Sequence, residues 1–99
     1  MDRQLRQLPI PAGAADDDRA IELLRVWAAK GKQHVTLATE LWNDPASWGI
    51  MLVDSAKHIA NAYEQITGES QDGALARIKA GFDAEWQRAT DTPRGRVVE

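Results

Sequence analysis

The sequence predicts an α+β fold dominated by helices, with a short N-terminal strand, a helix, a strand, a long central helix and a terminal helix. Two periodicities predict it: apolar residues recur at helical spacing in three segments, whereas residues 32–39 alternate. The chain has 99 residues, 43% of them hydrophobic, and no cysteine, so we expect folding on an apolar core. We expect an extended lead-in at 1–15, a single compact domain at 16–90 and a flexible tail at 91–99.

The lead-in ends in a proline-rich stretch that favours extended backbone. Pro9 and Pro11 restrict their own backbone and that of the residues before them, and Leu8 and Ile10 lie two positions apart. Residues 6–10 are therefore expected to form a short edge strand, where the missing N–H groups of proline are tolerated.

A first helix is expected over residues 19–30. The acidic run 16–18 supplies an N-cap and negative charge at one end. Lys30 and Gly31 supply a cation and a residue tolerant of left-handed backbone at the other. The apolar side chains between them fall within an arc of roughly 160° at helical spacing.

Residues 32–39 follow the two-residue period of a half-buried strand, with Val35 and Leu37 on one side. The other side carries the polar set Lys32, His34 and Thr36. Because an isolated strand is unstable, this one pairs either with residues 6–10 or with the same strand of a second chain.

The longest helix is expected over residues 45–67. Asp44 can cap it, Pro45 suits the first helical position, and Gly68 ends it. Its apolar arc spans about 200°, wider than an ordinary surface helix needs. The arc has a bulky side made of Trp48, Leu52, Ile59, Tyr63 and Ile66 and a side of small residues that permits close helix approach. The candidate interface residues are Gly49, Ile50, Val53, Ala56 and Ala60 on this helix, with Val35 and Leu37 on the strand.

A last helix is expected over residues 71–89, capped by Ser70 or Asp72. It docks through one narrow stripe formed by Leu75, Ile78, Phe82, Trp86 and Ala89. Three tryptophans, Trp27, Trp48 and Trp86, lie on predicted core stripes. Trp42 precedes the long helix and could instead line a pocket.

One spacing in the chain is typical of a chemical site. Asp54 and His58 stand four residues apart on the long helix, so they could bind a divalent metal or a small molecule together with Trp42. The simpler interpretation is a surface pair, because a metal site requires further ligands. We expect no catalytic residues, no metal and no cofactor.

Nucleic-acid and membrane partners are not expected. A strand followed by two helices is similar to the ribbon-helix-helix DNA binders, and Lys32, His34 and Thr36 would then face the groove. The net charge of −3 opposes this alternative, because affinity for nucleic acid comes mainly from neutralised phosphates. The longest apolar run, 48–53, is too short to span a bilayer, and residues 1–10 lack the apolar segment of a signal peptide. A cytoplasmic location is expected.

Several short stretches together resemble a family of short bacterial proteins catalogued as a domain of unknown function, number 5076. The resemblance covers most of residues 8–88 and is carried by Leu8–Pro11, Leu41–Pro45, Trp48-Gly49, Asp54, His58–Tyr63 and Phe82–Trp86. Lys57 stands where the family has Arg before the histidine. The resemblance implies no established activity and no catalytic residues.

The leading functional hypothesis is a non-enzymatic protein that acts through protein association as a homodimer. It depends on the wide apolar arc of the long helix and on the under-paired strand. The alternatives are a small-molecule or metal-binding domain that uses Asp54 and His58, and a ribbon-helix-helix-like DNA binder.

Overall fold

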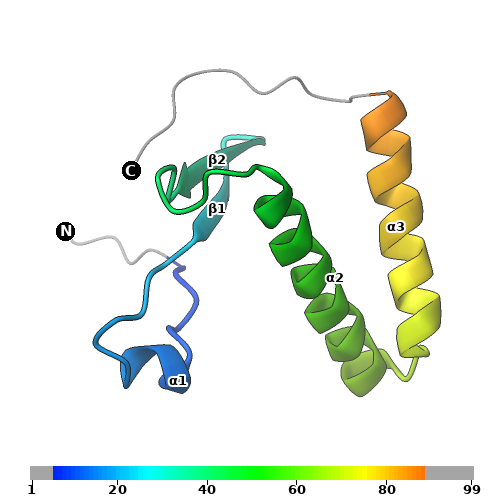
Figure 1. Ribbon diagram of the computed structural model, residues 1–99. Coiled ribbons are helices and arrows are strands. Elements are labelled where there is room, and N and C mark those ends of the chain that lie inside the picture. Colours follow the sequence, from blue (N-terminus) through cyan, green and yellow to red (C-terminus); the bar gives the residue numbers. More distant parts are fainter. Residues whose placement is uncertain (1–5, 89–99) are drawn as a thin grey trace. The chain divides into compact units, whose positions relative to one another are not determined.

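The computed structural model describes residues 6–88, which divide into two compact units, 6–39 and 40–88. The first unit contains helix α1 (Ala12–Ala15) and strands β1 (Leu24–Ala29) and β2 (Lys32–Leu37). The second contains helices α2 (Ala46–Thr67) and α3 (Gln71–Gln87) (Figure 1). The predicted α+β class, dominated by helix, is confirmed. The predicted tail at 91–99 lies outside the described residues, and the single compact domain at 16–90 stays a prediction.

The first unit is built around an antiparallel hairpin. β1 and β2 pair in register from Leu24 opposite Leu37 to Ala29 opposite Lys32. The two turn residues, Lys30 and Gly31, have φ angles of 55° and 73°. Two successive residues with positive φ twist the chain as a tight hairpin requires. The strand predicted at 32–39 is confirmed, and it pairs within its own chain.

The predicted helix at 19–30 is wrong, because residues 24–29 form β1. Lys30 and Gly31 tolerate left-handed backbone as expected, but they use it for the hairpin turn and not for a helix end. A strand beside β2 satisfies backbone groups that a helix at 19–30 would have left unpaired. Some apolar residues of this segment recur at helical spacing and others at the two-residue spacing of a strand. The need of β2 for a partner strand decides between the two.

Residues 6–11 form neither a helix nor a strand, so the predicted strand at 6–10 is also wrong. The single turn of α1 follows. The acidic run beyond it ends α1 and closes a turn, because the N–H of Ala20 donates to the carbonyl of Asp17 at 3.0 Å. The Asp17 carboxylate also accepts from the N–H of Arg19 at 2.9 Å. These acids therefore stabilise a turn, where the sequence predicts a helix start.

The ends of α2 follow the sequence prediction. The Asp44 carboxylate accepts from the N–H of Ala46 at 3.0 Å, beside Pro45. Gly68 ends the helix with a φ of 80°, and its N–H donates to the carbonyl of Glu64. A left-handed residue at this place is strained unless it is glycine. Both boundaries are thus fixed locally by the residues that predict them.

α3 begins three residues later and returns antiparallel to α2 (Figure 1). The Ser70 hydroxyl accepts from the N–H of Gly73 at 3.1 Å, which confirms the predicted cap. The Glu64 carboxylate accepts from the N–H of Gln71 at 2.9 Å, so α2 also holds the start of α3. The helix ends at Gln87, and Ala89 of the predicted stripe lies outside the described residues.

Little of this chain is buried. Among the described residues, only two apolar side chains are buried: Ala60 on α2, with 0% exposure, and Ala74 on α3, with 4%. Trp27 and Trp48 are half-buried, whereas Trp86 is 76% exposed, so its predicted place in the core is wrong. Within residues 6–88 no helix is long and apolar enough to cross a membrane.

Candidate functional site

A stripe of residues along α2, which we call the seam, alternates in steps of three and four. It consists of Gly49, Leu52, Ala56, Ile59, Tyr63 and Ile66. This spacing is the 3.5-residue repeat that brings two helices together as a coiled coil. Four of the six are large and all four are exposed, Ile66 at 83%. The seam is therefore an apolar helix face that the chain leaves open to solvent.

α3 packs on a neighbouring side of α2, and the seam residue Tyr63 lines a cleft with Ala74, Arg77 and Ile78 of α3. The buried Ala60 and Ala74 mark the contact between the two helices. At about 100° per residue, the middle of the seam lies roughly 70° around α2 from Ala60. The packing of α3 thus covers one part of the wide apolar arc that the sequence predicts, and the four large residues of the seam remain exposed. The seam was readable in the spacing of the bulky residues, but the sequence does not say which side α3 would take.

The α2–α3 hairpin is closed at its bend and open at its far end. On α3, the buried or half-buried residues all lie between Gln71 and Ile78, and residues 79–88 are exposed. Phe82 and Trp86 stack on each other with ring centroids 5.5 Å apart, and both remain exposed. The predicted docking stripe of α3 is therefore used only in its first half.

The small side of α2 was expected to admit a close neighbour. Apart from the helix's own backbone, no atom described lies within 4 Å of where a Cβ on Gly49 would stand. Ile50 is 66% exposed and Val53 53% exposed, while Ala56 is half-buried. Only Ala60, at the other end of this side, is covered. The predicted interface role of these residues stays a prediction.

Asp54 and His58 both lie exposed on α2, on the side away from the seam. The third residue of the predicted site, Trp42, packs instead against Trp48, edge to face, with ring centroids 5.0 Å apart. In the described part of the chain, no group of three or more His, Cys, Asp or Glu side chains could hold a metal ion. The pair therefore has neither the ligands nor the enclosure that a metal site takes.

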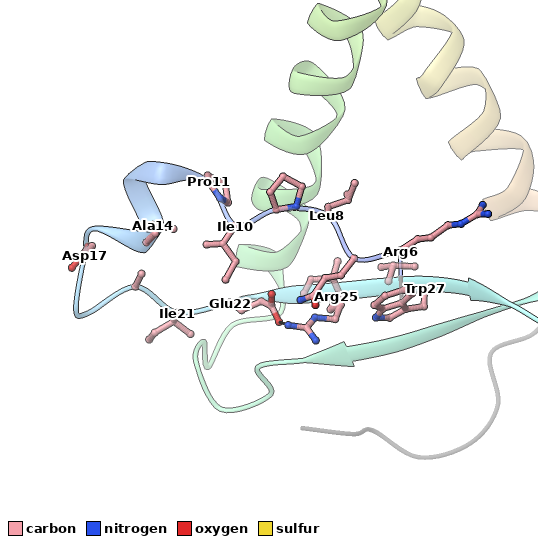
Figure 2. A pocket seen from close by; sticks show the side chains of 16 residues that line it. Arg6, Leu8, Ile10, Pro11, Ala14, Asp17, Ile21, Glu22, Arg25 and Trp27 are labelled. Atoms are coloured by element: carbon pink, nitrogen blue, oxygen red, sulfur yellow. Dashed lines mark ion pairs between the residues drawn. The ribbon is translucent and has the colours of Figure 1, made fainter. Parts of the chain in front are cut away.

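A cleft of about 670 Å³ lies in the first unit, between residues 6–11 and β1 (Figure 2). Its walls are mostly aliphatic, with Leu8, Ile10 and Ile21 among them. At its floor Arg25 pairs with the carboxylate of Glu22 at 2.8 Å, and both side chains are largely exposed. A smaller cleft of about 340 Å³ lies at the α2–α3 bend beside Tyr63. Neither cleft is lined by Asp54 or His58.

The two faces of the β1–β2 hairpin differ in the side chains that they carry. Val35 and Leu37 share one face with Leu24 and Val26, since cross-strand partners point to the same side. The opposite face carries Arg25, Trp27, Lys32, His34 and Thr36. On that face the His34 ring lies 3.1 Å from the carbonyl of Ala29, through Nε2. The three polar residues considered for a DNA contact, Lys32, His34 and Thr36, therefore lie on one face of the hairpin, together with Trp27.

Comparison with known proteins identifies a family and a similar solved structure. Residues 7–90 match the model of a family described as a domain of unknown function (DUF5076). A solved structure described as that of a "putative pyruvate dehydrogenase" from the photosynthetic bacterium Rhodopseudomonas palustrus CGA009 is similar, with a TM-score of 0.72 and 32% sequence identity. The match covers 97% of this chain and 98% of that one. No curated protein matches the chain.

Proposed function

The chain belongs to the DUF5076 family, and on that premise we propose that it is a non-enzymatic protein that works through association, as a homodimer joined by the α2 seam. The observation that carries the proposal is the exposed seam on a helix whose other apolar side is already used by α3. A contiguous apolar face of this kind marks an interaction site in a soluble protein. We place this association in the cytoplasm, because a chain without cysteine gains nothing from an oxidising compartment.

The seam favours a second copy of the same chain as the partner. When two α2 helices run antiparallel, Gly49 meets Ile66 of the second chain, Leu52 meets Tyr63, and Ala56 meets Ile59. In two of these three layers a small residue faces a large one, which fills space as a well-packed core does. The seam is thus complementary to itself.

The residues that flank the seam also suit a second copy. On the side away from α3 they are Trp48, Ser55 and Ala62. In an antiparallel pair these positions face their own counterparts, so charges there would repel one another. All three are uncharged, and nothing at the edge opposes self-pairing.

The solution mass tests this proposal. Size-exclusion chromatography with light scattering at high micromolar concentration should give the mass of two chains. Ile59→Glu places charges next to each other at the centre of the seam, so the dimer should dissociate at least 100-fold more readily. Gln65→Glu is the matched control, because Gln65 is exposed on the same helix outside the seam and the change adds the same charge. A monomer at this concentration, or equal loss from both variants, contradicts the proposal.

The catalytic alternatives are tested on the same sample. The similar structure carries the name of a pyruvate-oxidising enzyme, so pyruvate with thiamine diphosphate, a divalent metal and an electron acceptor is the appropriate assay. We expect no turnover. Divalent metals should also leave the thermal midpoint unchanged, both in the unmodified chain and in Asp54→Ala. Turnover, or a metal-dependent shift that Asp54→Ala removes, would favour an enzyme or a metal-binding domain.

A further inference from the structure

The strand β2 has one paired edge and one open edge, and the register of the hairpin identifies the open backbone groups. In an antiparallel ladder, residue pairs that exchange hydrogen bonds alternate with pairs whose N–H and C=O groups point outward. The N–H of Ala38 donates to the carbonyl of Leu23 at 3.0 Å, which fixes this alternation. The outward pairs are therefore Leu24 with Leu37, Val26 with Val35, and Ala28 with Gln33.

From this placement we propose that the open edge of β2 pairs antiparallel with the same edge of a second copy, about a two-fold axis at Val35. The proposal rests on the proposed homodimer and adds a second contact to it. In the part of the chain described, the outward groups of Gln33, Val35 and Leu37 bond to nothing. A two-stranded hairpin is marginally stable alone, and pairing two of them gives a four-stranded sheet.

The sequence of β2 is compatible with pairing to itself at this register. With Val35 opposite Val35 of the second copy, Gln33 meets Leu37, and all three outward residues take part, giving about six hydrogen bonds. Lys32 then meets Ala38, so no like charges are opposed across the axis. The strand contains no proline, and its one lysine lies at its first residue, so it lacks the usual protection of an exposed edge.

The corresponding edge of β1 is a poorer candidate. Residues 6–11 run beside β1 and line the same cleft as Leu24 and Val26 (Figure 2). An incoming strand would meet this segment, whose Pro9 and Pro11 have no N–H to donate. Pairing through β2 also joins the apolar faces of both hairpins, with Val26, Val35 and Leu37 from each copy on one side of the sheet.

Pairing at the β2 edge would also compensate for the short length of the seam. Six residues give fewer than three heptads, and sustained coiled-coil pairing usually takes three or four. A short seam therefore gains from a further contact within the same dimer. The two contacts belong to one dimer when a single two-fold axis relates both.

Hydrogen exchange of individual amides tests the edge directly. When dimers replace monomers on raising the concentration, the amides of Gln33, Val35 and Leu37 should exchange tenfold or more slowly, because they become hydrogen-bonded. The amides of Val26 and Ala28 on the β1 edge should not change. A dimer whose Val35 amide stays as fast as that of Val26 overturns this inference and leaves the seam proposal standing, whereas a monomer overturns both.

A pair of proline variants gives an independent measurement. The N–H of Val35 and that of Val26 both point outward, so proline at either position removes no bond between β1 and β2. Val35→Pro should weaken the dimer about 10- to 100-fold, because the two-fold axis removes two bonds at once. Val26→Pro should leave it unchanged. Equal weakening by the two variants, or a mass that grows beyond two chains with concentration, overturns the inference. Should Val35→Pro unfold the hairpin, Val35→Lys replaces it, since it opposes two charges across the axis.

Discussion

The two ends of the α2–α3 hairpin differ in how far their apolar side chains are buried. At the bend, Ala60 and Ala74 are buried, and the Glu64 carboxylate holds the start of α3. At the far end, Phe82 and Trp86 are exposed although they are larger and more apolar. The capping hydrogen bonds are equally good at both ends, with Asp44 at one and Ser70 at the other. Local hydrogen bonding thus forms the helices, whereas burial within the chain distinguishes the closed end from the open one.

The largest expected effect breaks the closed end. Ala60→Asp places a carboxylate where the side chain has no exposure, and an unpaired buried charge costs about 3–5 kcal/mol. Ala80→Asp is the matched control, since Ala80 is exposed on α3 and the change there costs about 0.5 kcal/mol of helix propensity. Urea unfolding followed by circular dichroism measures both. Similar losses from the two variants would mean that the closed end is not the stabilising contact.

The next effect concerns the bend. Gly68 has a φ of 80°, so Gly68→Ala should lose about 1–2 kcal/mol of unfolding free energy. Gly81 lies inside α3 with open space around it, and Gly81→Ala should gain about 1 kcal/mol. Thermal unfolding of the two variants gives shifts of opposite sign. A gain in both would show that the left-handed bend is not required.

The helix caps test whether the two ends differ in local bonding. Ser70→Ala removes the hydroxyl that accepts from Gly73, and Asp44→Ala removes the carboxylate that accepts from Ala46. Each should cost about 1 kcal/mol. Equal losses in chemical denaturation support the view that capping does not distinguish the ends. A loss confined to Ser70→Ala would show that the open end is already frayed.

The smallest effect lies on the exposed half of α3. Lys79 and Asp83 form an ion pair at 2.7 Å, one turn apart, and both side chains are largely exposed. Lys79→Ala should cost about 0.3–0.5 kcal/mol, and the difference should vanish in about 1 M salt, which screens exposed charges. The denaturation midpoint in low and high salt measures this. A salt-independent loss would point to packing by the lysine side chain and not to the ion pair.

Helix ends that are set by nearby capping or helix-ending residues were predictable from the sequence. The bounds of α2 follow from Asp44, Pro45 and Gly68, and the start of α3 follows from Ser70. The segment 24–29 was not predictable in this way, because Leu24 shares a helix face with Trp27 but a strand face with Val26. Lys30 and Gly31 suit the end of a helix and the turn of a hairpin alike. Only the need of β2 for a partner decides between the two.

The candidate site was predictable in part. The wide apolar arc of α2 indicates more apolar surface than one neighbour covers, and the exposed seam agrees with it. The part of this arc that α3 covers depends on which residues α3 contacts, and no periodicity in α3 indicates them. Trp86 illustrates the limit, since it lies on the apolar stripe of α3 and is nevertheless exposed. Periodicity identifies an apolar face but not the surface that meets it.

Both tertiary pairings described here, β1 with β2 and α2 with α3, join neighbours in the sequence. Such short-range contacts close within microseconds, and a ribosome-bound chain could complete each as soon as it emerges. The chain would then reach its local structure long before it meets another copy. In the proposed dimer, the rate of assembly would be set by the encounter of two copies, and would therefore rise with the rate at which the chain is synthesised.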